Sequence, residues 1–218
     1  MSFKREVGLP GETLRFRIIM SSVISMKIQR ALLVTPPSGL YRRDDRCQCK
    51  VDDQTVAVTF PPMELGYLAA MMEKNGIICQ IHDYPAEKRG WEEYQSDFKF
   101  FNPDLLVINT TTPTLKNDLT AAQLAKNMKH SVYVVGRGEY FSVHEKEGVE
   151  IHPELDAAMR GEPELTMEEL VTQLNNGKEL DGILGLTYRN GTGVMVNPTR
   201  PLVTDLDQLP LPSRHLMQ

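Results

Sequence analysis

The chain has 218 residues, of which 41% are hydrophobic and 24% charged, as is usual for a globular protein. Its 24 basic and 29 acidic side chains give a net charge of −5, which argues against a nucleic-acid-binding surface. The three cysteines are too few for a disulfide framework, and no apolar run approaches the roughly 20 residues of a membrane-spanning helix. We therefore expect a cytoplasmic protein with no nucleic-acid partner and no membrane partner.

The first part of the chain carries little regular pattern. Residues 1–25 are expected to form a disordered tail or to precede a true start at Met26, because the first strand pattern begins only after them. An apolar run over 30–35 predicts a buried strand, which stops where Pro36 and Pro37 remove two hydrogen-bond donors. A polar stretch over 40–59 follows, and loops of that length are usually functional or mobile.

Helices and strands then alternate. Apolar residues at helical spacing, ended by Asn75-Gly76, predict a helix over 62–76. An apolar, β-branched run over 105–108 predicts a buried parallel strand. This alternation predicts an α/β fold, a doubly wound (flavodoxin-like or Rossmann-like) five-stranded parallel sheet in the order 2-1-3-4-5. Further strands are expected over 77–81, 131–135 and 157–160, and further helices over 91–101, 115–129 and 165–174.

The pattern changes beyond residue 178. Residues 183–189 and 194–196, joined by Asn190-Gly191-Thr192-Gly193, predict a hairpin. The rest of the chain is rich in proline and predicts an arm that packs loosely. We therefore divide the chain into an α/β domain over 26–178 and a hairpin with a linker arm over 179–218.

Small polar residues and glycines follow the ends of the predicted strands. In this strand order, a crevice opens at the carboxyl ends of the first and third strands. Hydroxyls there can satisfy polar groups of a ligand without adding charge, and glycines leave room for a flat group to approach the backbone. Helix capping by Thr114, and tight turns at the glycines, are the competing interpretations. The ligand-binding residues that we predict are Pro37, Ser38, Met63, Leu65, Thr110, Thr111, Thr112, Gly136, Gly138 and Gly161.

Several segments together resemble one known family. In order and spacing they resemble the N-terminal cobalamin-binding domain of the B12-dependent radical S-adenosylmethionine (SAM) enzymes, over roughly residues 27–215. The resemblance implies that this domain binds cobalamin. It also implies a C-terminal radical SAM domain in the intact protein, which would hold a [4Fe-4S] cluster and SAM. The segments that carry the resemblance are Thr35-Pro36-Pro37-Ser38, 61–70, Pro103-Asp104, 110–114, 160–165 and the arm over 197–212.

The sequence departs from related patterns in three places. Gly136-Arg137-Gly138-Glu139 stands where the family often has Gly-Gly-Pro-His. The loop after the first strand lacks the histidine of the methionine-synthase type of cobalamin domain, so we expect no protein imidazole on cobalt. His82 is the only nearby alternative. The Cys-x-x-x-Cys-x-x-Cys motif is absent, so we predict no catalytic residue and no metal ligand, and we leave open whether the chain is an enzyme.

Three functions remain open at this stage. The first is the cobalamin-binding domain of a radical SAM enzyme of the methyltransferase or cyclase class, holding the corrin at the carboxyl edge of the sheet. The second is a stand-alone, non-catalytic cobalamin sensor or carrier. The third is another flavodoxin-like ligand-binding protein, although no G-x-G-x-x-G motif for a dinucleotide follows the first strand.

Overall fold

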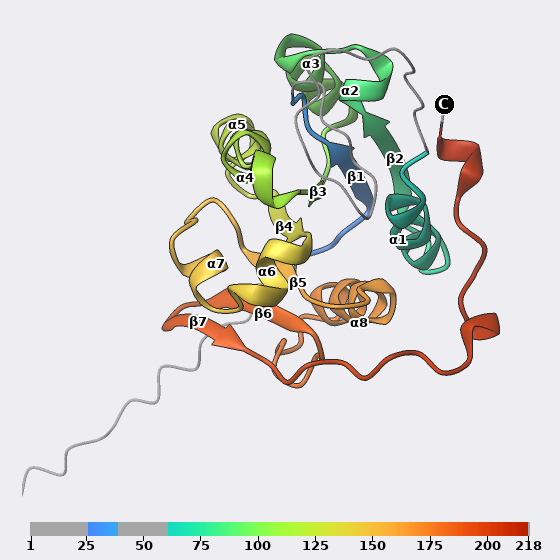
Figure 1. Ribbon diagram of the computed structural model, residues 1–218, viewed down its shortest axis with the longest axis vertical. Coiled ribbons are helices and arrows are strands. Elements are labelled where there is room, and N and C mark those ends of the chain that lie inside the picture. The colour runs from blue at the N-terminus through green and yellow to red at the C-terminus, as the bar shows by residue number, and fades with distance from the viewer. Residues whose placement is uncertain (1–25, 39–60, 218) are drawn as a thin grey trace, which may run out of the picture.

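One seven-stranded sheet forms the centre of the computed structural model, which describes residues 26–38 and 61–217 (Figure 1). The strand order is β2-β1-β3-β4-β5-β6-β7. Neighbours among the first five strands pair in parallel, and β6 and β7 continue the sheet antiparallel. The strands are β1 Arg30–Thr35, β2 Ile78–Asp83, β3 Leu105–Asn109, β4 Tyr133–Arg137, β5 Ala157–Met159, β6 Leu186–Asn190 and β7 Gly193–Val196.

The predicted five-stranded sheet is corrected to a mixed sheet of seven strands, although the order 2-1-3-4-5 is observed within it. The predicted hairpin is present, but it pairs with β5 instead of standing apart. Ala157 lies opposite Tyr188, and Met159 lies opposite Leu186. The pairing has a physical reason, because β5 has only three residues, all buried, and would otherwise present an unpaired edge.

Helices cover both faces of the sheet. α1 and α8 pack on one face and α3 and α5 on the other, each over its own hydrophobic core (Figure 1). The α-helices are α1 Met63–Glu73, α2 Tyr84–Glu87, α3 Trp91–Phe101, α4 Leu115–Asp118, α5 Thr120–Met128, α6 Glu139–Val143, α7 Glu147–Glu150 and α8 Glu164–Asn175. Short 3₁₀ turns are η1 Thr112–Thr114, η2 Leu206–Gln208 and η3 Arg214–Leu216.

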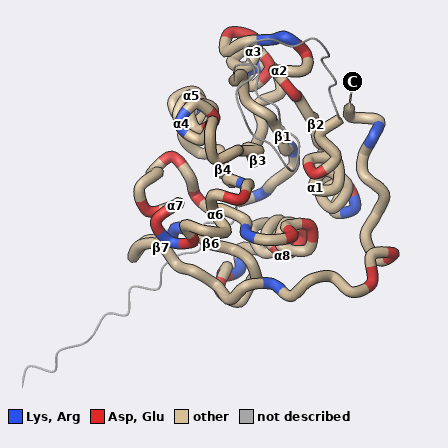
Figure 2. The backbone as a smooth tube through the Cα atoms, viewed as in Figure 1, with Lys and Arg blue, Asp and Glu red and all other residues tan. Residues whose placement is uncertain are grey.

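The inner parallel strands β1, β3, β4 and β5 are apolar except at their ends, as burial on both faces requires, whereas the edge strand β2 carries Gln80 in its middle. Figure 2 shows acidic and basic positions gathered mainly on helices and loops. One charge that organises the sheet is Asp104, just before β3. Its carboxylate accepts hydrogen bonds from the amides of Gln29 and Arg30 and lies 3.1 Å from the Lys129 ammonium, so it fixes the start of β1 beside β3.

The predicted helix over 115–129 is divided in two. α4 ends at Asp118 and α5 begins at Thr120, and the turn η1 precedes both. Leu119 between them keeps helical backbone angles, and the Gln123 amide donates to the Leu119 carbonyl, so α5 continues the direction of α4. At the start of α4, the Asp118 carboxylate turns back to bind the amide of Thr111 and the hydroxyl of Thr114. These bonds tighten the entry to the helix.

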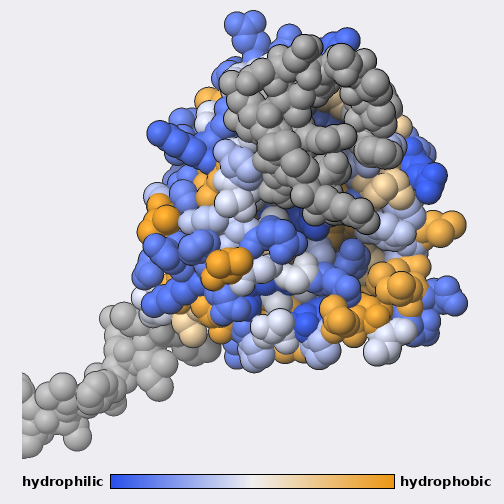
Figure 3. Space-filling model, in the orientation of Figure 1, coloured by the Kyte–Doolittle hydropathy of each residue, from blue (hydrophilic) through white to orange (hydrophobic). Residues whose placement is uncertain are grey.

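The arm after β7 was expected to pack loosely, but both of its ends are bound to helices. Arg200 Nη2 lies 2.7 Å from the Glu169 carboxylate on α8, and the Ser213 amide donates to the Gly66 carbonyl on α1 at 3.0 Å. Between these anchors, Leu202, Leu206 and Leu211 are exposed. Figure 3 shows hydrophobic residues gathered on the side of the molecule along which the arm runs.

Among the described residues, every helix is too short or too polar to cross a membrane. The expectations for residues 1–25 and for the polar stretch 40–59 lie outside the residues that the structure describes.

Candidate functional site

The crevice is predicted at the place where β1 and β3 end side by side. Val34 of β1 is in register with Ile108 of β3, so the segments after Thr35 and after Asn109 leave the sheet together. The helix that follows β1 packs with α8 on one face, and the helices that follow β3 pack with α3 on the other. Such a reversal is the place where open α/β sheets hold ligands.

The hydroxyl turn after β3 is tied together internally. The Thr110 hydroxyl donates to the Arg137 carbonyl of β4 at 2.9 Å. The Thr114 hydroxyl donates to the Asp118 carboxylate at 2.5 Å, and therefore the Thr111 hydroxyl donates to Thr114 at 2.7 Å. Only Thr112, of the three predicted ligand-binding threonines, is exposed.

Asp118 is the residue of this turn that the sequence prediction missed. Its side chain is fully buried, and it accepts from the Thr111 amide at 3.2 Å as well as from Thr114. The position of Thr114 before Leu115 predicts a helix cap. Thr114 does flank the helix, but its hydroxyl donates to the Asp118 carboxylate, and its side chain does not cap a backbone amide. An acid four residues after a hydroxyl was the signal that could have found this contact.

The loop after β1 is held by Asn117, the residue that precedes Asp118 in α4. The side-chain amide of Asn117 donates to the Pro37 carbonyl at 2.7 Å. Pro37 is buried, and Ser38 beside it is half-buried. The structure therefore brings the predicted residues Pro37 and Ser38 close to the turn after β3.

The three predicted glycines differ in their surroundings. A side chain at Gly136 would overlap the ring of Phe141, so this glycine serves packing of α6 on the sheet. Gly138 has φ +145° and lies against the carbonyl and hydroxyl of Thr110, too close for any side chain. Gly161, with φ +64°, has open space where a side chain would lie. Of the three, Gly161 is the one beside which a ligand has room.

The two predicted residues of α1 also differ. Met63 begins the helix and is half-buried. Leu65 is fully buried within the core under α1, so its side chain has no surface for a corrin edge. Beside them, Glu64 forms an ion pair with Arg137 of β4, which also donates to Asn109 at 3.0 Å. This pair links the start of α1 to the ends of β3 and β4.

His82, the alternative cobalt ligand, lies at the end of β2 within a polar cluster. Its Nδ1 atom is 3.4 Å from the Glu87 carboxylate and 3.4 Å from Arg89 Nη1. Arg89 in turn donates to Asp97 at 2.8 Å. These contacts give His82 a structural role at the end of β2.

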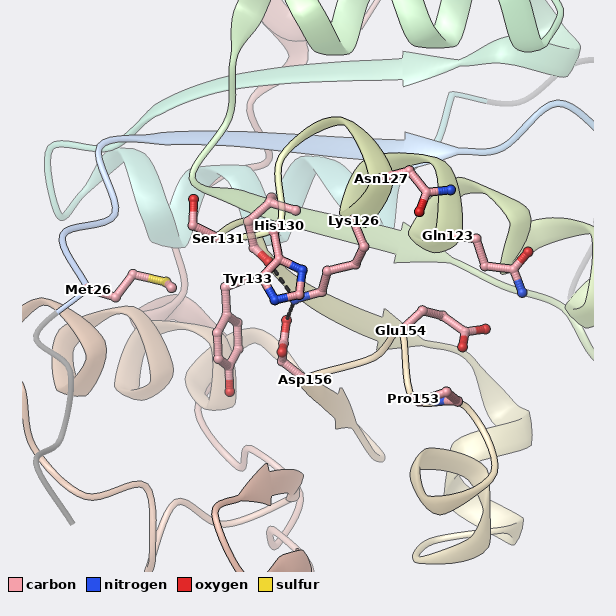
Figure 4. A pocket seen from close by; sticks show the side chains of 11 residues that line it. Met26, Gln123, Lys126, Asn127, His130, Ser131, Tyr133, Pro153, Glu154 and Asp156 are labelled. Atoms are coloured by element: carbon pink, nitrogen blue, oxygen red, sulfur yellow. Dashed lines mark hydrogen bonds and ion pairs between the residues drawn. The ribbon is translucent and has the colours of Figure 1, made fainter.

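A cavity of about 770 Å³ lies at the opposite, amino-terminal edge of the sheet (Figure 4). Its lining residues precede β4 and β5, and its central charged groups bind one another. Lys126 Nζ lies 2.6 Å from the Asp156 carboxylate, which also accepts from the Val134 amide at 2.7 Å. Because these groups stabilise the strand starts, this cavity is distinct from the predicted site.

Comparison with known sequences decides the family. The sequence profile of the B12 binding domain matches residues 50–171, which include α1, the hydroxyl turn and the glycines after β4 and β5. The chain belongs to the B12-binding domain family. The resemblance drawn from the sequence is thereby confirmed, and the domain is related to B12-dependent radical SAM methyltransferases.

Three known proteins illustrate the relationship. An uncharacterized methyltransferase of Pyrococcus horikoshii, PH0819, is 35% identical over 192 residues, covering 88% of this chain and 39% of its own length. The cobalamin-dependent radical SAM methyltransferase TokK of Streptomyces tokunonensis is 25% identical, with 70% and 23% covered. The radical enzyme OxsB, solved with aqua-cobalamin and SAM bound, has a TM-score of 0.66 at 16% identity, with 86% and 24% covered.

The chain thus spans well under half the length of these relatives. Its carboxyl edge fits cobalamin in two respects. Gly161 leaves an open space beside the backbone, and the exposed hydroxyl of Thr112 with the half-buried Ser38 offers uncharged partners for ribose, phosphate and amide groups. The fit does not extend to Leu65 or Gly136, whose surroundings are filled by protein.

Proposed function

We propose that this B12-binding domain holds cobalamin at the carboxyl edge of its sheet, as part of a radical SAM protein of the methyltransferase or cyclase class. The observation that carries the proposal is the family match over residues 50–171, and the ends of β1 and β3, which lie side by side in the sheet, support the location. The ligand-binding residues are then Pro37, Ser38, Met63, Thr110, Thr111, Thr112, Gly138 and Gly161, with Thr110, Thr111 and Gly138 acting through the shape of the backbone.

The chemistry of the crevice suits the nucleotide tail of the cofactor. Ribose hydroxyls and a phosphate can bind hydroxyls and backbone amides near Ser38 and Thr112. Arg137, at the end of β4 and paired with Glu64, would supply a cation for the phosphate of a bound cofactor. When bound, cobalamin supplies a cobalt that can carry a methyl group, and the domain contributes orientation of that group.

Titration with hydroxocobalamin, followed by its absorption spectrum, tests the proposal. We expect saturable binding of one cofactor per chain. In the reduced complex, electron paramagnetic resonance should show no nitrogen coupling from a protein imidazole, because His82 is engaged with Glu87 and Arg89. The variant His82→Ala should give the same spectrum. Absence of binding at about 1 mM cofactor would contradict the proposal.

The same proposal assigns the arm a role as the connection to a radical SAM domain, with its [4Fe-4S] cluster and SAM. Leu202, Leu206 and Leu211 are exposed at 75%, 66% and 88%, and exposed apolar groups of this size commonly mark a contact surface. We expect hydrogen exchange over 202–211 to be fast in this chain and slow in a longer protein. A gene that continues without a Cys-x-x-x-Cys-x-x-Cys motif would instead favour a stand-alone carrier.

A further inference from the structure

We propose that Asn117 and Asp118 of α4 form a clamp that sets the width of the crevice and thereby selects corrinoids with a nucleotide tail. The inference rests on the proposed function, because it concerns the same crevice. It assigns a positioning role to two residues that the sequence prediction did not include.

The clamp consists of adjacent residues that hold the two opposite loops of the crevice. Asn117 donates from its side-chain amide to the Pro37 carbonyl, 2.7 Å away in the loop after β1. Asp118 accepts from the Thr111 amide at 3.2 Å and from the Thr114 hydroxyl at 2.5 Å in the turn after β3. Since the two residues are joined by one peptide bond, the two loops are held at a fixed separation.

The burial of Asp118 gives its contacts strength. Its side chain is fully buried, and a carboxylate in such a place forms short, charge-assisted hydrogen bonds. The fixed turn leaves Thr112 exposed, next to the buried Thr111. Loss of the Asp118 charge would allow the turn to relax and would move Thr112 away from its place.

A flat corrin ring and a nucleotide tail make different demands on this crevice. The tail must enter between the two loops, so its affinity depends on their separation. A corrinoid that lacks the tail would bind only at the outer surface, near Met63 and Gly161, and would not depend on the clamp. The ratio of the affinity for a corrinoid with a nucleotide tail to that for a corrinoid without one therefore measures the effect of the clamp.

The experiment compares the binding of cobalamin with that of cobinamide, which lacks the nucleotide tail. The parent chain should bind cobalamin more tightly. Asn117→Ala and Asp118→Asn should each weaken cobalamin binding by about tenfold, the loss of one well-placed hydrogen bond, and change cobinamide binding less than twofold. Hydrogen exchange at the Thr111 amide should also accelerate in Asp118→Asn.

Two variants at the far edge of the sheet serve as controls. Asn127→Ala removes an exposed amide, and Asp156→Asn weakens the ion pair with Lys126, so the second variant lowers stability without touching the crevice. Neither should alter the ratio of cobalamin to cobinamide affinity. Asn117 is exposed, so Asn117→Ala remains a valid test even where Asp118→Asn fails to fold.

The outcomes separate the inference from the function on which it rests. Equal losses for cobalamin and cobinamide would overturn the clamp, and so would a parent chain that binds both corrinoids equally; either result would leave cobalamin binding itself intact. A parent chain that binds neither corrinoid would overturn the proposed function and the clamp together.

Discussion

The terminal methyl group of Met217 occupies the space that a side chain on residue 66 would need, so the Met217 side chain packs directly against Gly66. The Ser213 amide donates to the Gly66 carbonyl at 3.0 Å, and the Ser213 hydroxyl donates to the carboxylate of Glu73, about two turns further along the same helix. The final segment therefore packs against α1, the helix whose first residue, Met63, lies at the predicted site.

A double-mutant cycle measures this contact. Gly66→Ala should gain helix propensity of about 1 kcal/mol but lose it again to the overlap with Met217. In a Met217→Ala background only the tight contact with Pro212 Cβ, at 3.2 Å, remains, so the same change should be more favourable than in the parent. Denaturant unfolding of the four proteins gives the coupling energy. Additive effects would show that Met217 does not rest on Gly66.

The contacts of Asp104 predict that the free energy of unfolding depends on pH. Partial burial of its carboxylate opposes ionisation, but hydrogen bonds from the Gln29 and Arg30 amides and from Lys129 outweigh that effect and lower its pKa. Because the folded pKa lies below the unfolded value of about 4, the stabilisation is present above that pH. It should be lost as the pH falls from there through the folded pKa.

The variant Asp104→Asn should remove this part of the acid sensitivity. It should also lower the unfolding free energy at pH 7 by about 1–3 kcal/mol, since charge-assisted bonds to two amides are weakened. Urea unfolding at several pH values between about 3 and 7 provides the measurement. An unchanged slope of stability against pH would mean that Asp104 is not the group responsible.

Cys79 should be unreactive in the folded protein. Its side chain is buried, and burial together with the nearby Glu73 charge raises the pKa of its thiol to about 12. Only the thiolate attacks thiol reagents. In a variant with Cys47→Ser and Cys49→Ser, modification should be more than about a hundredfold slower in buffer than in denaturant. Rapid modification in buffer would show that β2 opens readily.

Much of the fold was predictable because its central strands carry strong, local signals. The runs 30–35, 105–109 and 133–137 are almost purely apolar, and burial on both faces demands that pattern. The place of the hairpin was not predictable, because β6 joins β5 through contacts between residues about 30 positions apart. Strand periodicity identifies a hairpin but does not reveal its partner.

The strand ends that frame the candidate site were predictable, because the predicted order of strands is observed. The surroundings of individual residues depended on packing that the sequence does not display. Leu65 follows the apolar pattern of α1 into the core, and Gly136 accommodates the ring of Phe141 from a helix, α6, that was not predicted. Asp118 was missed because its partners lie seven and four residues earlier, across a 3₁₀ turn.

Two glycines of the predicted site allow a matched comparison. Gly138→Ala should destabilise the fold by about 2–4 kcal/mol, because the new side chain would overlap the Thr110 backbone in addition to the strain of φ +145°. Gly161→Ala has open space and should cost only about 1–2 kcal/mol, the strain of a left-handed residue. Thermal unfolding of both variants tests the order. Equal losses would indicate that Thr110 moves aside freely.

The threonines of the hydroxyl turn separate a structural role from a ligand-binding role. Thr111→Val removes the bond to Thr114 inside a buried cluster and should lower the unfolding free energy by about 1 kcal/mol. Thr112→Val changes an exposed side chain, so stability should stay within about 0.5 kcal/mol of the parent. Its cobalamin affinity should nevertheless fall about five- to hundredfold, the loss of a hydrogen bond to a buried ligand group. Calorimetric titration and thermal unfolding of the same two proteins measure both quantities. If Thr112→Val binds cobalamin as tightly as the parent, the turn shapes the fold alone, and the cofactor tail lies elsewhere along the carboxyl edge.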